Sequence, residues 1–261
     1  MGALPPSPFV YENHMIHFHA VWKSYIKEFF RTSLPALQDI SFSLQQGQTL
    51  GLIGANGAGK STCIKLLMDF IRPDQGEILV LGTTPNDYRV RHRIGYLPET
   101  ANFPANLTAL DMLRFTGGTC NMRPAAMRAA AEKWLRRLGL WEDRKRPLRN
   151  YSKGMQQRAN FAIALLNDPE LLILDEPMSG LDPIGRADIL ALIGELKEQG
   201  KSILFCSHIL EDVDRLVDNV LVLHKGRKLF EGQPRALAEQ QNRATFVEGY
   251  LSLVQEGIPN G

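Results

Sequence analysis

Residues 54 to 62 read Gly-Ala-Asn-Gly-Ala-Gly-Lys-Ser-Thr and fill the spacing G-x-x-x-x-G-K-[ST]. This pattern is typical of a phosphate-binding loop, because glycines let the backbone turn so that successive N–H groups converge on an anion. We expect the Lys60 ammonium to reach the β- and γ-phosphates of a nucleotide and the Ser61 hydroxyl to ligate magnesium. The other residues expected to contact the nucleotide in this stretch are Gly54, Asn56, Gly57, Gly59 and Thr62.

The elements on either side of this loop support the prediction. Residues 49 to 53 form a short apolar run typical of a buried strand, and residues 62 to 69 have the apolar spacing of a helix. A helix that begins at the loop adds the positive end of its dipole to the attraction for phosphate. The alternative is a glycine-rich turn between a strand and a helix with no ligand, which the full match to the motif and its context disfavour.

A second group of chemically capable residues follows another buried strand. Residues 171 to 174 are a continuous apolar run, as expected of a parallel strand buried on both faces, and Asp175 and Glu176 follow at once. In such a sheet the nucleotide lies at the carboxyl ends of the strands, so we expect both acids at the active site. Asp175 is predicted to hold magnesium, and Glu176 to polarise a water for attack on the γ-phosphate. The alternative is two acids that cap a strand.

A third motif is Tyr-Ser-Lys-Gly-Met-Gln-Gln-Arg at residues 151 to 158, at the start of a predicted helix. The amino end of a helix can bind an anion through its N–H groups and its dipole. The stretch resembles the signature motif of ATP-binding-cassette (ABC) proteins, in the form frequent in ATPases of bacterial ABC-2 exporters. Ser152 and Gly154 match the family consensus Leu-Ser-Gly-Gly-Gln, whereas Tyr151, Lys153 and Met155 depart from it.

The resemblance to the ABC family assigns roles to further residues. Tyr25 is similar to the aromatic residue that stacks on adenine, and Asp182 ends a segment that resembles the D-loop. His208 resembles the switch histidine, which contacts the γ-phosphate and holds the attacking water. Glu99 stands where the family has the Q-loop glutamine, and we expect this carboxylate to approach the magnesium ion directly or through water. A loop acid exposed to solvent is the alternative for Glu99.

The resemblance also implies partners. In the family, two cassettes pack head to tail around two ATP molecules, and each ATP contacts the phosphate loop of one chain and the signature of the other. We therefore expect ATP and Mg²⁺ as cofactors and a second ABC ATPase chain as partner, with a homodimer preferred to a heterodimer. We further expect a separate transmembrane permease, a cytoplasmic location at the inner face of the cell membrane, and export. The alternatives are a soluble ABC ATPase outside transport and a regulatory module without hydrolysis.

The predicted fold is α/β: a P-loop NTPase (RecA-like) core with a mostly parallel sheet, an antiparallel β subdomain and an α-helical signature subdomain. The cassette is expected to span residues 1 to 232, with the helical subdomain inserted at about 107 to 167, and residues 233 to 261 to form a short helical tail. We also predict a strand at residues 16 to 21 and an irregular loop at residues 27 to 35.

Composition excludes several classes of protein. With 30 Lys and Arg against 28 Asp and Glu, the formal charge of +2 gives no reason to expect a nucleic-acid partner. The three cysteines lie far apart, which disfavours a disulfide framework or a zinc site, and we expect His14, His17 and His19 to be surface residues rather than metal ligands. We see neither a signal peptide nor an apolar run long enough to span a bilayer, and expect the chain to be soluble.

Overall fold

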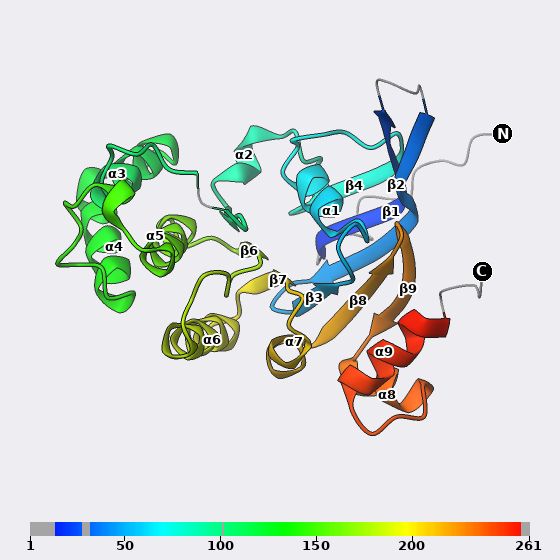
Figure 1. The fold of residues 1–261 in the computed structure, drawn as a ribbon. Coiled ribbons are helices and arrows are strands. Elements are labelled where there is room, and N and C mark those ends of the chain that lie inside the picture. The colour runs from blue at the N-terminus through cyan, green and yellow to red at the C-terminus, as the bar shows by residue number, and fades with distance from the viewer. Residues whose placement is uncertain (1–13, 28–31, 101, 257–261) are drawn as a thin grey trace. The chain divides into compact units, whose positions relative to one another are not determined.

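The structure, a computed structural model, describes residues 14–27, 32–100 and 102–256. These residues form two compact units (Figure 1). The first unit takes its residues from 1–90 and 217–261, and the second from 91–216.

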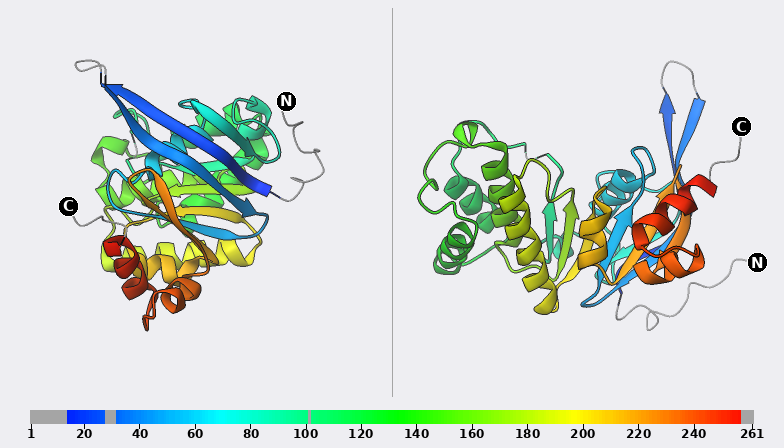
Figure 2. Two further views of the ribbon diagram at one scale, coloured as in Figure 1. Left: turned by 90° about the vertical axis from the view of Figure 1, so that its right-hand side faces the viewer. Right: turned by 60° about the horizontal axis from the view of Figure 1, so that its bottom comes forward.

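An antiparallel sheet in the first unit consists of β1 (His14–Lys27), β2 (Thr32–Gln45) and β4 (Gln75–Val80), in the order β2-β1-β4. Figure 2 shows β1 and β2 as long neighbouring strands (blue). The predicted strand at residues 16 to 21 is therefore too short. The prediction of an irregular loop at residues 27 to 35 is wrong at residue 27 and at residues 32 to 35. These residues belong to β1 and β2, which pair with each other there. Residues 28–31 lie outside the described residues.

Polar residues of β1 beyond the predicted range have partners that let the strand continue. Lys23 lies 2.7 Å from the Asp74 carboxylate, and the same carboxylate accepts a hydrogen bond from the backbone N–H of Ser24. The histidines of β1 also have neighbours, since the rings of His14 and His17 are 5.4 Å apart. His19 is exposed, as expected, but His14 and His17 are half-buried, and burial lowers the pKa of His17.

The core of the first unit is formed by β3 (Thr49–Ile53), β8 (Asn219–His224) and β9 (Arg227–Gly232). Strand β3 pairs with β8 in parallel, and β9 pairs with β8 in antiparallel fashion. Helix α1 (Lys60–Leu67) follows β3 through the glycine-rich loop. The predicted helix at residues 62 to 69 is shifted by two residues, because Gly59 in the left-handed conformation lets Lys60 and Ser61 enter the first turn.

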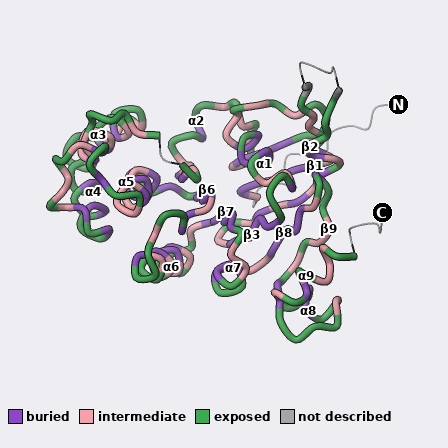
Figure 3. The backbone as a smooth tube through the Cα atoms, in the orientation of Figure 1, coloured by how far each residue is buried: buried purple, intermediate pink, exposed green. Residues whose placement is uncertain are grey.

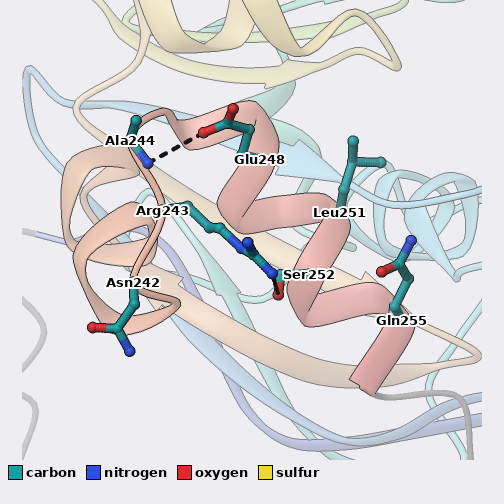
Figure 4. A pocket seen from close by; sticks show the side chains of 7 residues that line it. All are labelled: Asn242, Arg243, Ala244, Glu248, Leu251, Ser252 and Gln255. Carbon is teal, nitrogen blue, oxygen red and sulfur yellow. Dashed lines mark hydrogen bonds between the residues drawn. The ribbon is translucent and has the colours of Figure 1, made fainter.

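The short helical tail predicted at residues 233 to 261 contains α8 (Pro234–Gln240) and α9 (Phe246–Glu256). A pocket lined by the loop that follows α8 and by α9 is drawn in Figure 4, and the Arg243 guanidinium in it lies 3.3 Å from the Ser252 hydroxyl. This pocket contains none of the residues to which the sequence assigns chemistry. Among all helices of the described residues, none is both long and apolar enough to cross a membrane.

The second unit contains a parallel sheet in the order β5-β6-β7, with registers that bring Leu97 beside Leu174 and Asp175 beside Cys206. Strands β6 and β7 are buried over their whole length (Figure 3). For β6, this burial was predicted from the continuous apolar run at residues 171 to 174. The strands are β5 (Ile94–Leu97), β6 (Leu171–Asp175) and β7 (Ser202–Cys206). The helices that accompany them are α3 (Ala109–Thr119), α4 (Pro124–Arg137), α5 (Lys153–Leu165), α6 (Pro183–Glu198) and α7 (Leu210–Leu216). A short helix, α2 (Tyr88–Arg91), precedes β5.

An ion pair joins α6 to α7 in the second unit. The Arg186 guanidinium donates two hydrogen bonds, of 2.8 and 3.1 Å, to the carboxylate of Asp212, whose side chain is only 3% exposed. We expect Asp212→Ala to lower the free energy of unfolding by about 2 kcal/mol, because it removes the acceptor that holds this arginine. Urea unfolding measures the change. Asp143→Ala is the control, since its pair with Arg146 is exposed and 3.4 Å long, and should cost less than about 0.5 kcal/mol. Equal effects of the two variants would contradict a structural role for the α6–α7 pair.

Candidate nucleotide-binding and catalytic site

The phosphate loop depends on backbone conformations that side chains rarely adopt. Gly57 has a φ of 78° and Gly59 a φ of 115°. A Cβ atom on Gly54 would lie 2.3 Å from the Leu223 carbonyl oxygen, and one on Gly59 would lie 2.7 Å from a methyl group of Leu37. Larger residues would therefore strain the loop or push β2 and β8 away from it.

Lys60 lies in the first turn of α1, and the motif predicts that its ammonium group contacts the phosphates of a nucleotide. Its ammonium donates hydrogen bonds to the carbonyl oxygens of Gly54 at 2.6 Å and of Ala55 at 3.3 Å. No side chain caps the amino end of this helix, so its first N–H groups are available to an anion. The loop, the ammonium and the helix end together form a site suited to phosphate.

Tyr25 and the phosphate loop line one pocket of about 310 Å³ in the first unit. The tyrosine comes from β1, where it pairs with Leu34 of β2, and it is 40% exposed. An exposed aromatic ring beside a phosphate site is suited to stacking on a nucleotide base. The remaining residues that line the pocket are Ala36, Asn56, Gly57, Ala58, Gly59, Lys60, Ser61 and Thr62.

In the second unit, the two acids lie at the carboxyl end of β6. Asp175 is its last residue and is buried, and Glu176 follows with a φ of 48°. The Glu176 carboxylate lies 2.8 Å from Nδ1 of His208, and the Glu176 N–H donates to the Cys206 carbonyl. The structure therefore brings together the predicted catalytic glutamate and the predicted switch histidine, which are far apart in the sequence.

Tyr96 of β5 and Cys206 of β7 belong to the two strands that pair with β6. Burial raises the pKa of Tyr96 to about 12, and the charge of Asp175 adds to this shift. The tyrosine is thus a neutral hydrogen-bond donor at physiological pH. Cys206 is a buried thiol, as is Cys63 of α1, whose pKa burial raises to about 12. Neither thiol is suited to nucleophilic chemistry.

The predicted anion site at the signature is a capped helix end. Ser152 is the N-cap of α5, and its hydroxyl accepts a hydrogen bond of 3.2 Å from the Met155 N–H. A Cβ atom on Gly154 would lie 3.5 Å from the Gly180 carbonyl, so the signature approaches the segment that ends in Asp182. The Asp182 carboxylate in turn caps α6, because it accepts a hydrogen bond from the Gly185 N–H at 2.9 Å. The nucleotide contacts predicted for Ser152, Gly154 and Asp182 stay predictions.

Glu99 lies just beyond β5 and is exposed. The carbonyl of the preceding residue, Pro98, accepts a hydrogen bond from the side chain of Asn160 on α5. In the same helix, the Gln157 amide donates to the backbone that follows β6. Gln157 and Asn160 were not among the predicted site residues, and no local signal distinguishes them from the other polar residues of this helix, Lys153, Gln156 and Arg158.

Magnesium suits the oxygen ligands predicted from the sequence, the hydroxyl of Ser61 and the carboxylates of Asp175 and Glu99. Over the described residues, no group of three or more His, Cys, Asp or Glu side chains could hold a metal ion. An all-protein cage is not needed for Mg²⁺, which usually keeps water and substrate phosphates in its coordination shell. Each of these donors, taken by itself, is of a type that suits a magnesium ion arriving with a nucleotide.

The α/β fold with its phosphate loop defines a P-loop nucleotide-binding protein. Residues 37–179 match the ABC transporter family, and the chain belongs to that family. It is 42% identical, over 85% of its length, to an uncharacterized ABC transporter ATP-binding protein of Synechocystis, and 38% identical, over 82% of its length, to Nod factor export ATP-binding protein I of Sinorhizobium fredii. It covers only 62% and 63% of those two relatives.

Other comparisons cover more of the related protein. The ABC transporter ATP-binding protein NatA of Bacillus subtilis is 33% identical over 85% of this chain and 92% of that relative. The solved structure of an ATP-binding subunit of an ABC transporter superposes with a TM-score of 0.84 at 30% identity, over 92% of this chain and 99% of that one. The predicted fold class is thus confirmed, and the predicted membership of the ABC family is also confirmed.

Proposed function

We propose that this chain binds and hydrolyses ATP and that it is the energy-coupling subunit of a membrane transporter. The observation that carries the proposal is the contact of 2.8 Å between the Glu176 carboxylate and the His208 imidazole, directly after the buried Asp175. A base held by a second proton-carrying group is suited to activate water. The phosphate loop and Lys60 supply the complementary requirement, a site for the phosphates.

In this proposal, each residue has a distinct task. Lys60 and the N–H groups of the loop bind the β- and γ-phosphates, and Tyr25 stacks on the adenine. Glu176 accepts a proton from the attacking water while His208 orients it. The water oxygen forms a bond to the γ-phosphorus, and the bond from that phosphorus to the β–γ bridging oxygen breaks, which leaves ADP and phosphate. Magnesium, held by Ser61 and Asp175, would neutralise negative charge on the phosphates.

The proposed partners are a second copy of this chain and a separate membrane permease. The family contains transporter subunits, and a 38% identical relative is called a Nod factor export ATP-binding protein, which supports export for this chain. We place the chain at the inner face of the cell membrane. We also propose that residues 1 to 232 form the cassette, with the helical subdomain at about 107 to 167 and the tail at 233 to 261. The rival, a soluble ABC ATPase, requires no membrane partner.

Two measurements on the full chain test the proposed function. Phosphate release from ATP, with and without magnesium, tests hydrolysis. Purification from membranes in mild detergent, followed by identification of the associated proteins, tests the transporter role. Hydrolysis without any associated membrane protein would favour the soluble ATPase, and absence of hydrolysis in the assembled complex would overturn the proposal.

A prediction concerns Glu99, whose carboxylate replaces the amide usual in the family. If it approaches the magnesium ion, Glu99→Gln should retain most ATPase activity but need roughly fivefold more magnesium for half-maximal rate, because one negative charge near the cation is lost. Glu99→Ala should in addition lose stimulation of hydrolysis by the reconstituted permease. Titrations of magnesium at saturating ATP measure the first effect. Normal magnesium dependence and normal stimulation of Glu99→Ala would make Glu99 the exposed loop acid of the alternative interpretation.

A further inference from the structure

Helix α5 carries two buried amide side chains on one face. Gln157 and Asn160 are three residues apart, so they project from the same side of the helix, and they are only 4% and 5% exposed. The other buried residues of α5 are apolar: Ala159, Phe161, Ala162, Ala164 and Leu165. Because an unpaired amide in such surroundings is costly, the partners of these two side chains show what the helix holds in place.

The partners are carbonyl groups just beyond two strands that end at the proposed active site. Asn160 Nδ2 donates to the Pro98 carbonyl at 3.2 Å, next to Glu99. Gln157 Nε2 donates to the Pro177 carbonyl at 3.0 Å and lies 3.5 Å from the Glu176 carbonyl. One helix face therefore contacts the backbone beside both acidic residues.

These two contacts lie beyond the ends of the strands, where the backbone no longer pairs with a neighbouring strand. The ladder between β5 and β6 ends at the pair of Leu97 and Leu174, so the Pro98 carbonyl is beyond the last pair. Proline has no backbone N–H group, so neither Pro98 nor Pro177 can donate a backbone hydrogen bond to a neighbouring segment. The two amides of α5 thus supply restraint at the points where the backbone leaves the strands.

We propose that Asn160 and Gln157 are positioning residues that couple the signature end of α5 to Glu99 and Glu176. The helix is continuous from Lys153 to Leu165, and Ser152 caps its amino end. A displacement of that end moves both amides, because a packed helix moves as one element. This inference rests on the proposed function, since it describes how contact at the signature would regulate the same hydrolytic site.

The two positioning roles predict different kinetic defects. Asn160→Leu and Gln157→Leu keep the approximate size of each side chain and remove its donor. Both should lower kcat about tenfold and leave KM for ATP within about twofold, because the misplaced groups act on the reaction and not on nucleotide binding. Only Asn160→Leu should also shift the magnesium dependence, since it acts through Glu99.

The matched control is Asn167→Leu, just beyond the end of α5. Asn167 Nδ2 donates to the His92 carbonyl, which precedes β5 and so lies at the opposite end of that strand from Pro98. This variant also loses a hydrogen bond from an asparagine amide to a backbone carbonyl and should keep both kcat and the magnesium dependence. An equal defect in Asn167→Leu would mean that loss of any such bond weakens this unit, and it would overturn the specific coupling.

A double-mutant cycle separates positioning from general destabilisation. If Asn160 acts through Glu99, the shift in magnesium dependence caused by Asn160→Leu should largely disappear in the Glu99→Gln background. Additive shifts would show that Asn160 does not act through Glu99 and would overturn this half of the proposal.

Amide hydrogen exchange of the full chain without nucleotide tests the coupling independently of hydrolysis. Asn160→Leu should raise exchange in a peptide covering residues 94 to 100, and Gln157→Leu in one covering residues 175 to 181, while a peptide covering residues 202 to 206 stays unchanged. A wild-type chain that fails to hydrolyse ATP would refute the proposed function but leave these expectations intact. Unchanged exchange in both variants would refute the coupling even if the wild type hydrolyses ATP.

Discussion

Glu176→Gln is expected to lower kcat for ATP hydrolysis about a thousandfold while ATP binding is retained, because the amide cannot accept the proton of the attacking water. The variant should therefore accumulate an ATP-bound dimer, which size-exclusion chromatography with ATP and magnesium detects. The glutamine is nearly the same size as the carboxylate it replaces. The contact with His208, 2.8 Å long in the wild type, can persist as a neutral hydrogen bond.

The control for this prediction is Glu198→Gln, which removes an exposed carboxylate at the end of α6. It changes the charge of the chain by the same amount as Glu176→Gln, and should hydrolyse ATP at the wild-type rate. If Glu176→Gln also hydrolysed ATP at that rate, the base would have to be a different residue. If it lost ATP binding together with hydrolysis, Glu176 would act on the ground state instead of the transition state.

Lys60→Ala is expected to weaken ATP binding itself, by about 30-fold, because hydrogen bonds from a charged donor to phosphate contribute roughly 2 kcal/mol. Titration with a fluorescent ATP analogue measures the affinity. Hydrolysis falls as a consequence, and this distinguishes the variant from Glu176→Gln, which binds ATP but does not turn it over.

Lys65→Ala provides the matched control, since Lys65 is exposed in the last turn of the same helix, α1. The two variants remove the same charge and truncate the same side chain, but only Lys60 belongs to the phosphate loop. Equal affinities of Lys60→Ala and the wild type would contradict the assignment of the loop. Thermal unfolding of both variants should be compared, because Lys60 also donates to the carbonyl oxygens of Gly54 and Ala55.

Several elements could be predicted because their signals are local. The phosphate loop is a strand, a glycine-rich turn and a helix in direct succession, and the run before Asp175 is apolar throughout. The hairpin of β1 and β2 could not be predicted in this way. Its polar residue Lys23 lies within a strand because Asp74, far along the chain, provides the partner for its charge.

The sequence by itself determined the motifs, their order and the class of chemistry, because residue types and short spacings suffice to specify a phosphate loop and a strand that ends in acids. Only the tertiary structure decided which of these residues meet. Glu176 contacts His208 because the parallel register of β6 and β7 aligns Asp175 with Cys206. Likewise, Gln157 and Asn160 became candidates for positioning only through their carbonyl partners, which lie in other segments of the chain. Such partners are set by packing between distant segments, and no local pattern encodes them.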